Sequence, residues 1–316
     1  MKRALEGGTI VALVAVPWLF PDAYVIHVMV VVFIFSILAT GLDLVMGYCG
    51  QFSFGQAAFY GIGAYTSALL ARDLGAPFWI TLPASTLVAA AFGALLGIPA
   101  VRLAGHFLAV TTIAFQVIVT LVLTQWHGFT GGTAGITGIP SPPPIHALGR
   151  TWVSFDSPQG YYHLSLVVAL VVVMLARRLT TTRLGQEWLA VREDELLAKT
   201  LGINTTKVKL LAFTLGAALA GTAGSLIAHY LRNVHPSEFT IWTSAEIVAM
   251  VILGGRGTFL GPILGALVLT TLPEYLRFAK DYKLVLFGLT LIVMTAFLPQ
   301  GVLGGLRRLR DRTAAA

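Results

Sequence analysis

Long apolar segments are the feature that most limits how this chain can fold. They run to about twenty residues, the length of a helix that crosses a membrane, whereas a membrane β-strand needs about ten. Of the 316 residues, 56% are hydrophobic and only 11% are charged, whereas soluble proteins carry about 25% charged residues. The sequence therefore predicts an all-α, polytopic helical membrane protein that forms a single transmembrane domain over residues 1–316.

The apolar segments predict about ten transmembrane helices with both termini in the cytoplasm. The first segment is interpreted as a span, because no small-residue cleavage site of a signal peptide follows it. Residues 241–253 and 260–272 are short and flank a glycine-rich turn, so they form either two spans or a re-entrant hairpin. The predicted spans cover residues 9–20, 24–46, 50–71, 77–99, 106–125, 164–179, 210–230, 241–253, 260–272 and 284–298.

Residues 177–209 form a long polar stretch that sets the orientation of the chain. Seven of the 21 Lys and Arg residues fall in it, and basic residues next to spans stay on the cytoplasmic side. With this stretch inside, 15 of the 21 basic residues are cytoplasmic and six are outside. The net charge of +7 then reflects span ends that face the cytoplasm and anionic lipid, and it does not indicate a nucleic-acid surface.

The middle of this stretch predicts one helix over residues 186–201, which contain no Gly or Pro. Gly202 and Asn204 give a stop signal after it. Charged residues share one face, and leucines form apolar stripes on others. Such a helix is too short and too charged to span a bilayer. It either packs against another protein or is a connector that lies on its own chain or on lipid headgroups.

Small residues are concentrated in two places that predict close helix packing. The first is residues 47–68, rich in Gly and Ala, with polar side chains at the start of a span. This segment is either a tightly packed helix or a helix that lines a translocation path. The second is a face made by Gly216, Ala220 and Gly224, spaced four apart.

Reactive and ionisable groups are scarce within the predicted spans. Asp43 is expected at a hydrated inner end, and Glu246 is either a functional acid or a hydrated group near the outer end. The single cysteine, Cys49, excludes an internal disulfide and a thiolate metal cluster. With no catalytic cluster within the spans and no Walker A motif, a membrane enzyme is not favoured. A secondary transporter usually needs more intramembrane charges than these two acids.

Three blocks of the sequence resemble the permease subunits of branched-chain amino-acid ABC importers, in particular the M-type member of the permease pair. Residues 187–195, continuing through Ala198 to 201–204, resemble the coupling helix that docks on the ATP-binding subunit. These residues lie in a block of resemblance that spans residues 185–265, and residues 47–68 and 130–140 form the other two blocks. An older importer signature is matched loosely by Glu195, Ala198 and Gly202.

The resemblance implies a permease of the bacterial inner membrane that forms a heterodimer with a second permease subunit. Two ATP-binding subunits would hold ATP and Mg, so this chain would carry no cofactor, no metal and no catalytic residue. An extracytoplasmic binding protein would deliver leucine, isoleucine or valine. Related importers carry urea, short amides or other amino acids, and a stand-alone secondary transporter is a further alternative.

The resemblance also implies particular site residues. Charge reversal at residues 192–195 is expected to leave folding intact, because these residues are expected on an exposed helix. The outer loop, residues 126–161, either docks the binding protein or caps the helices. The coupling residues are Glu187, Trp188, Arg192, Glu193, Asp194, Glu195, Ala198 and Gly202; the substrate-path residues are Gln51, Ser53, Phe54, Gln56, Tyr65 and Glu246; the outer-loop residues are Thr130, Gly131, Gly132 and Gly135.

Overall fold

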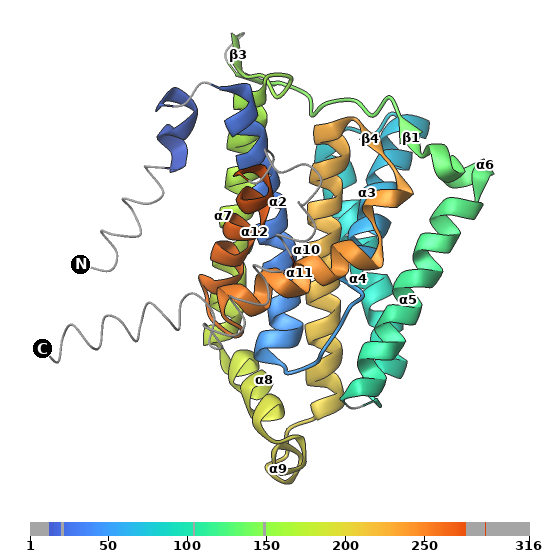
Figure 1. Ribbon diagram of the computed structural model, residues 1–316, viewed down its shortest axis with the longest axis vertical. Coiled ribbons are helices and arrows are strands. Elements are labelled where there is room, and N and C mark those ends of the chain that lie inside the picture. Colours follow the sequence, from blue (N-terminus) through green and yellow to red (C-terminus); the bar gives the residue numbers. More distant parts are fainter. Residues whose placement is uncertain (1–12, 20–21, 104, 148–149, 276–287, 289–316) are drawn as a thin grey trace, which may run out of the picture.

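The computed structural model describes residues 13–19, 22–103, 105–147, 150–275 and 288. Its architecture is a bundle of long helices, with one long outer connection between α5 and α7 (Figure 1). Residues 13–19 are helical, and the last predicted span and the C-terminal arginines lie outside the described residues. The long helices are α2 (Ala23–Asp43), α3 (Gln56–Asp73), α4 (Phe78–Ala100), α5 (His106–Gln125), α7 (Pro158–Thr181), α10 (Thr205–Leu231), α11 (Ile241–Gly254) and α12 (Gly261–Tyr275).

A multi-pass helical membrane protein is confirmed by these elements. Within the described residues, six helical segments are long and apolar enough to cross a membrane. The total of ten spans and the cytoplasmic position of both termini stay predictions. The six segments are Ala23–Tyr48, Phe78–Ala100, His106–Gln125, Pro158–Thr181, Thr205–Leu231 and Pro236–Gly254.

Two short sheets add β structure to the predicted all-α fold. Strand β1 (Ile136–Thr137) pairs antiparallel with β4 (Asn233–Val234). Strand β2 (Ile145–Ala147) pairs antiparallel with β3 (Arg150–Val153). These strands give the outer loops backbone hydrogen bonds that an irregular chain would lack. A period-2 pattern cannot be recognised in strands of two to four residues, so the sequence did not predict them.

Helix α10 is the centre of the bundle, and it contacts α2, α3 and α4 (Figure 1). Its small residues lie where backbones meet. A Cβ on Gly216 would contact the Gly41 carbonyl oxygen of α2, and a Cβ on Gly224 would overlap the Tyr60 carbonyl oxygen of α3. The Gly216, Ala220 and Gly224 face therefore packs inside this chain.

Buried polar side chains tie the same helices together. His229 on α10 bonds through Nε2 to Ser67 of α3 and to Thr81 of α4. Its Nδ1 bonds to the Pro140 carbonyl oxygen in the outer loop, at 2.7 Å. Because lipid offers no hydrogen bonds, polar groups at membrane depth must be satisfied inside the protein.

The outward faces of α4 and α5 are apolar, as a lipid-facing surface requires. Among the described residues of these helices, the large exposed side chains are Trp79, Ile80, Leu87, Phe92, Leu95, Ile98, Phe107, Val110, Val117, Ile118, Leu121 and Val122. Such a face suits contact with lipid or with another membrane subunit rather than with water.

The third span begins later than predicted. The apolar pattern places its start at Gly50, whereas α3 begins at Gln56. Gly50 has a left-handed φ of 73°, which ends the preceding helical turn. The Phe54 amide donates to Thr112 Oγ1 of α5 at 3.0 Å, so tertiary bonds replace helical ones in this irregular stretch.

Asp43 is buried, and the expectation that it is hydrated at a span end is wrong. Its carboxylate Oδ1 accepts a hydrogen bond from the Gly257 amide at 2.8 Å, and the residue is only 2% exposed. The turn between α11 and α12 covers it. The sequence did not show this, because the two residues are 214 positions apart.

The tight packing of α10 against α3 predicts a marked effect of a single methyl group. Gly224→Ala should lower the melting temperature in detergent, because the added Cβ overlaps the Tyr60 carbonyl oxygen and overpacking costs about 1–3 kcal/mol. Gly128→Ala is the matched control, since no heavy atom lies within 4 Å of its added Cβ. Equal melting temperatures for the two variants would contradict this packing.

Candidate functional site

The segment between α7 and α10 forms the lower tip of the structure in Figure 1. It contains α8 (Arg183–Glu193) and α9 (Glu195–Thr200), so the prediction of one helix over residues 186–201 is wrong. Asp194 separates the two with extended backbone angles, φ −156° and ψ 108°. Its carboxylate accepts from the amides of Leu196 and Leu197 at 2.8 and 2.9 Å. This N-cap starts a new helix and thereby breaks the longer one.

The inner side of this segment is anchored to the bundle. Trp188 is fully buried, and its indole N–H donates to the Val208 carbonyl oxygen of α10 at 3.0 Å. Ala198 and Val191 belong to the same buried cluster. Trp188 and Ala198, both predicted coupling residues, are therefore covered by their own chain and position the segment.

Glu195 makes a half-buried ion pair that fixes α9. Its carboxylate contacts the Lys209 ammonium group at 2.5 Å and that of Lys199 at 3.1 Å. The Lys209 side chain is 2% exposed, so reversing the charge of Glu195 would leave a buried cation beside another cation. The expectation that Glu195 lies on an exposed face is wrong, and charge reversal there is instead expected to destabilise the fold.

The ion pair also controls the protonation of Glu195. Burial alone raises the pKa of this carboxyl, but hydrogen bonds from Lys209 and Lys199 outweigh burial and hold the pKa below its usual value. The pair is therefore ionised at neutral pH.

The outer side of α9 is apolar and uncovered within the described part of the chain. Leu196, Leu197 and Leu201 are 74%, 58% and 71% exposed. We call these three side chains the α9 leucine face. Large apolar side chains grouped on a water-facing tip are typical of a protein interface. The apolar stripes in the sequence indicated such a face, although the residues chosen as coupling residues were mainly the charged ones.

The remaining predicted coupling residues have local structural contacts. Glu187 pairs with Arg183 one turn earlier, at 3.1 Å, and Glu193 pairs with Arg192 at 2.7 Å. Arg192 also donates from Nη1 to the Gly47 carbonyl oxygen at 2.7 Å. Gly202 follows the end of α9 as predicted.

The predicted substrate-path residues are mostly inside this subunit. The Gln56 side-chain amide donates to the carbonyl oxygens of Leu38 and Gly216, each at 3.2 Å. Ser53, which precedes Gln56 in the sequence, is also buried. The Tyr65 hydroxyl is buried and has no hydrogen-bond partner among the described residues. Gln51, Phe54 and Glu246 are half-buried. Their contact with a substrate stays a prediction.

The predicted outer-loop residues form tight turns. The Thr130 hydroxyl donates to the carbonyl oxygen of Leu123 at 2.8 Å. Gly131 and Gly132 follow the short helix α6 (His127–Thr130). Gly135 has a left-handed φ of 70°, and a Cβ there would overlap the Val234 carbonyl oxygen of β4. These contacts agree with a structural cap; docking of a partner on the loop stays a prediction.

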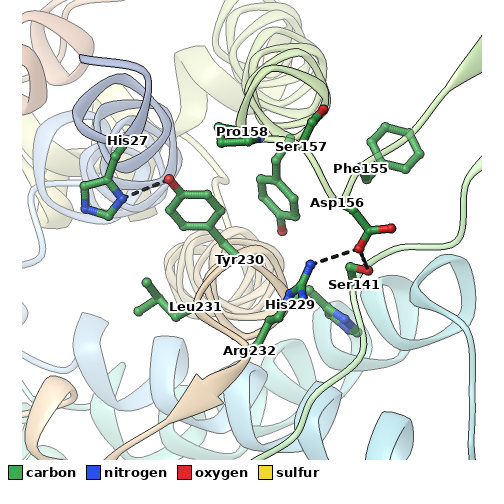
Figure 2. A pocket seen from close by; sticks show the side chains of 11 residues that line it. His27, Ser141, Phe155, Asp156, Ser157, Pro158, His229, Tyr230, Leu231 and Arg232 are labelled. Atoms are coloured by element: carbon green, nitrogen blue, oxygen red, sulfur yellow. Dashed lines mark hydrogen bonds and ion pairs between the residues drawn. The ribbon is translucent and has the colours of Figure 1, made fainter. Parts of the chain in front are cut away.

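A pocket of about 440 Å³ opens beside this cap, and sequence reasoning did not identify it. Figure 2 shows His27 with Tyr230 on one side and Arg232 with Asp156 and Ser141 on the other. Arg232 Nη2 lies 2.9 Å from Asp156 Oδ1, and His27 Nδ1 lies 2.8 Å from the Tyr230 hydroxyl. No local pattern could have predicted it, because its residues come from α2, α7, α10 and the outer loop. Within the described residues, no group of His, Cys, Asp and Glu forms a metal site.

Comparison with known proteins decides the family. The family described as "Branched-chain amino acid transport system / permease component" matches residues 24–295. The chain belongs to this permease family. The match spans the bundle, α8, α9 and the outer loop.

Individual relatives agree with this membership. Proteins named "High-affinity branched-chain amino acid transport system permease protein LivM" from Salmonella typhimurium and Escherichia coli are 36% and 37% identical over 95% of this chain and 77% of their own length. The LivH permease protein of Escherichia coli K12 is 26% identical over 85% of this chain. No solved structure matches.

The ion pair at Glu195 predicts a stability difference between two neighbouring carboxylates of this permease. Glu195→Gln should lower the free energy of unfolding by on the order of 2 kcal/mol, because Lys209 loses its charged partner. Glu193→Gln is the control and should cost at most about 1 kcal/mol, since its side chain is 72% exposed. Thermal denaturation in detergent compares the two.

The same pair predicts the pH dependence of that difference. Because the folded-state pKa of Glu195 is lowered, its contribution is present above the unfolded pKa and is lost as the pH falls through the folded pKa. The gap in stability between wild type and Glu195→Gln should close in acid. A gap that persists below this range would show that the ion pair is not its source.

Proposed function

We propose that this chain is a permease subunit of an ATP-binding-cassette importer that carries branched-chain amino acids across the bacterial inner membrane. In this proposal it forms the translocation path together with a second permease subunit. Two ATP-binding subunits bind ATP and Mg and hydrolyse the ATP. An extracytoplasmic binding protein delivers the substrate. The names of the LivM and LivH relatives, which both match this chain, support the proposal.

The α9 leucine face is the observation that carries the proposal at the level of structure. Its three side chains lie on the tip of the one long polar segment between spans, and the basic residues assign that segment to the cytoplasm. Burying a leucine side chain contributes about 1.5–3 kcal/mol, so the face offers a substantial contact. A stand-alone transporter has no use for such a face, whereas an importer needs one for its ATPase.

In the proposal, one set of residues anchors this segment to the bundle and another set contacts the ATPase. Trp188 and the Glu195–Lys209 pair hold the segment against the bundle, while the leucines project away from it. A partner that grips the leucines then acts on α10 through rigid contacts. Substrate contact at Gln51, Ser53, Phe54, Gln56, Tyr65 and Glu246 remains part of the proposal.

The docking role predicts that charge on the α9 leucine face removes the ATPase. Leu197→Asp combined with Leu201→Asp should abolish co-purification of the ATP-binding subunits, because a carboxylate cannot enter an apolar groove without a partner. The melting temperature of the solubilised permease should stay near that of wild type, since both side chains are exposed. Arg102→Asp, at an exposed turn between α4 and α5, is the control and should retain the ATPase.

The substrate is tested by transport in proteoliposomes that contain the assembled importer. With its binding protein outside and ATP inside, uptake of labelled leucine should be competed by isoleucine and valine, and not by urea or acetamide. If only urea or acetamide competed, the assigned substrate would be those solutes and not branched-chain amino acids. Uptake without any ATP-binding subunit would refute the importer.

A further inference from the structure

The inner end of α2 contains a π-helical turn, η1 (Leu44–Tyr48), directly after α2. In this turn the Cys49 amide donates to the Leu44 carbonyl oxygen, and the Gln51 amide donates to that of Val45, at 3.1 and 2.9 Å. Such widened turns are rare, less stable than α-helix, and often found at functional positions. Something outside the turn must therefore hold it in place.

Two other parts of the chain supply that support. Arg192, in the last turn of α8, donates to the Gly47 carbonyl oxygen at 2.7 Å. The Gly257 amide, in the turn between α11 and α12, donates to Asp43 Oδ1 at 2.8 Å. The α8 helix and the α11–α12 hairpin thus meet on residues 43–47, α8 at the Gly47 backbone carbonyl and the hairpin at the Asp43 side chain. We call Asp43, Gly47, Arg192 and Gly257 the inner junction.

The residues of the inner junction are closely packed against one another. A Cβ on Gly47 would overlap both the Asp43 carboxylate and the Gly257 amide nitrogen. A Cβ on Gly257 would lie 2.9 Å from Arg192 Nη1. A shift of the Arg192 guanidinium toward the junction must therefore move Gly47, the Gly257 turn, or both, and a shift away from it breaks the hydrogen bond to Gly47.

A contact from α7 holds the hairpin turn from the other side. The Arg177 guanidinium carbon lies 4.9 Å from the centre of the Phe259 ring, a cation–π contact. The Thr258 hydroxyl donates to the Gly255 carbonyl oxygen within the turn, at 2.6 Å. The turn is consequently held both by its own hydrogen bond and by α7.

Burial gives the junction a second constraint. Asp43 is 2% exposed, so its carboxyl group depends on partners inside the protein. These are the Gly257 amide, which donates to it, and the nearby guanidinium groups of Arg192 and Arg256. Withdrawal of Arg192 thus weakens the environment of Asp43 as well as the bond to Gly47.

We propose that the inner junction transmits movement of α8 and α9 to the α11–α12 hairpin, with Arg192 and Asp43 as positioning residues. The inference rests on the proposed function, in which an ATPase grips the α9 leucine face. A pull on that face displaces the end of α8, where Arg192 lies one residue before Glu193 and the Asp194 break. The π-turn is the deformable element, because it can exchange its wide hydrogen bonds for α-helical ones.

The test measures substrate transported per ATP hydrolysed, normalised to assembled complex, in proteoliposomes. Arg192→Met keeps the apolar stem and removes the donors. We expect transport per ATP to fall about tenfold, the change that loss of one charge-assisted hydrogen bond can make in a conformational equilibrium. Asp43→Asn keeps an oxygen for Gly257 and removes the charge, so a smaller fall is expected.

Arg183→Met is the matched control, on the same helix and with the same substitution. The Arg183 side chain is 92% exposed and contacts Glu187, away from the junction. Its transport per ATP should equal that of wild type.

A double variant decides whether Arg192 and Asp43 act through one path. Asp43→Asn with Arg192→Met should be no worse than Arg192→Met alone, because both substitutions release the same turn. A loss equal to the product of the two single losses would overturn the inference. Unchanged transport per ATP in Arg192→Met would also overturn the inference, and so would a variant whose only defect is reduced assembly of the complex. Either result would mean that the junction stabilises the structure without transmitting movement.

Failure of the proposed function has a different signature. It would appear in the wild-type complex, as absence of an associated ATPase or of branched-chain amino-acid uptake. If the complex is an importer for a different substrate, uptake of branched-chain amino acids cannot serve as the readout. ATP hydrolysis is then measured instead, with and without the binding protein, which is purified from the expressing cells with its own substrate bound. Failure of the inference appears in the variants while the wild-type complex stays active, as equal transport per ATP in Arg192→Met and Arg183→Met, as a multiplicative loss in the double variant, or as a loss of assembly alone.

Discussion

Close approach of helix backbones around α10 is the constraint on which the rest of the structure depends. In a membrane, apolar side chains gain nothing by leaving lipid for another helix, so contact must come from packing and hydrogen bonds. Gly216 and Gly224 allow α10 to touch the backbones of α2 and α3. His229 then adds hydrogen bonds to α3 and α4. The central helix is thereby fixed along its whole length.

That fixed helix carries groups at both ends that organise the rest. At its inner end, Lys209 and the Val208 carbonyl oxygen hold α9 and α8. At its outer end, Arg232 meets Asp156 of the outer loop. A rigid rod with an attachment at each end suits a protein that must relate events on opposite sides of a membrane. The family membership gives that relation its biological setting.

Sequence reasoning succeeded where long apolar segments determine the answer and failed where distant residues meet. Segment length predicted α4 and α5 closely, whereas α7 begins at Pro158, before the predicted start at residue 164. Asn204 caps α10 as its side chain suggested. The start of α3 was missed because Phe54 bonds to Thr112, 58 positions away.

Within the candidate site, the sequence predicted the segment but not its faces. Family resemblance marked Trp188 and Glu195, and the structure shows both turned toward the bundle. A sequence motif contains residues that pack inside the chain as well as residues that contact a partner. A single sequence does not show which residues have which role. The break at Asp194 was missed because the residue types around it all favour helix, while the capping geometry depends on tertiary anchoring of α8.

Buried and exposed positions alternate along α9, and this separates the contacts within the chain from the side chains that are open to a partner. Glu195 and Ala198 are tied to the chain itself, whereas Leu196, Leu197 and Leu201 face outward. The first group must change together with Lys209 and the buried cluster around Trp188, but the second is free of such internal bonds. In the proposed importer, a change of ATPase would therefore call for changes in the three exposed side chains and would leave the buried contacts of the membrane domain as they are.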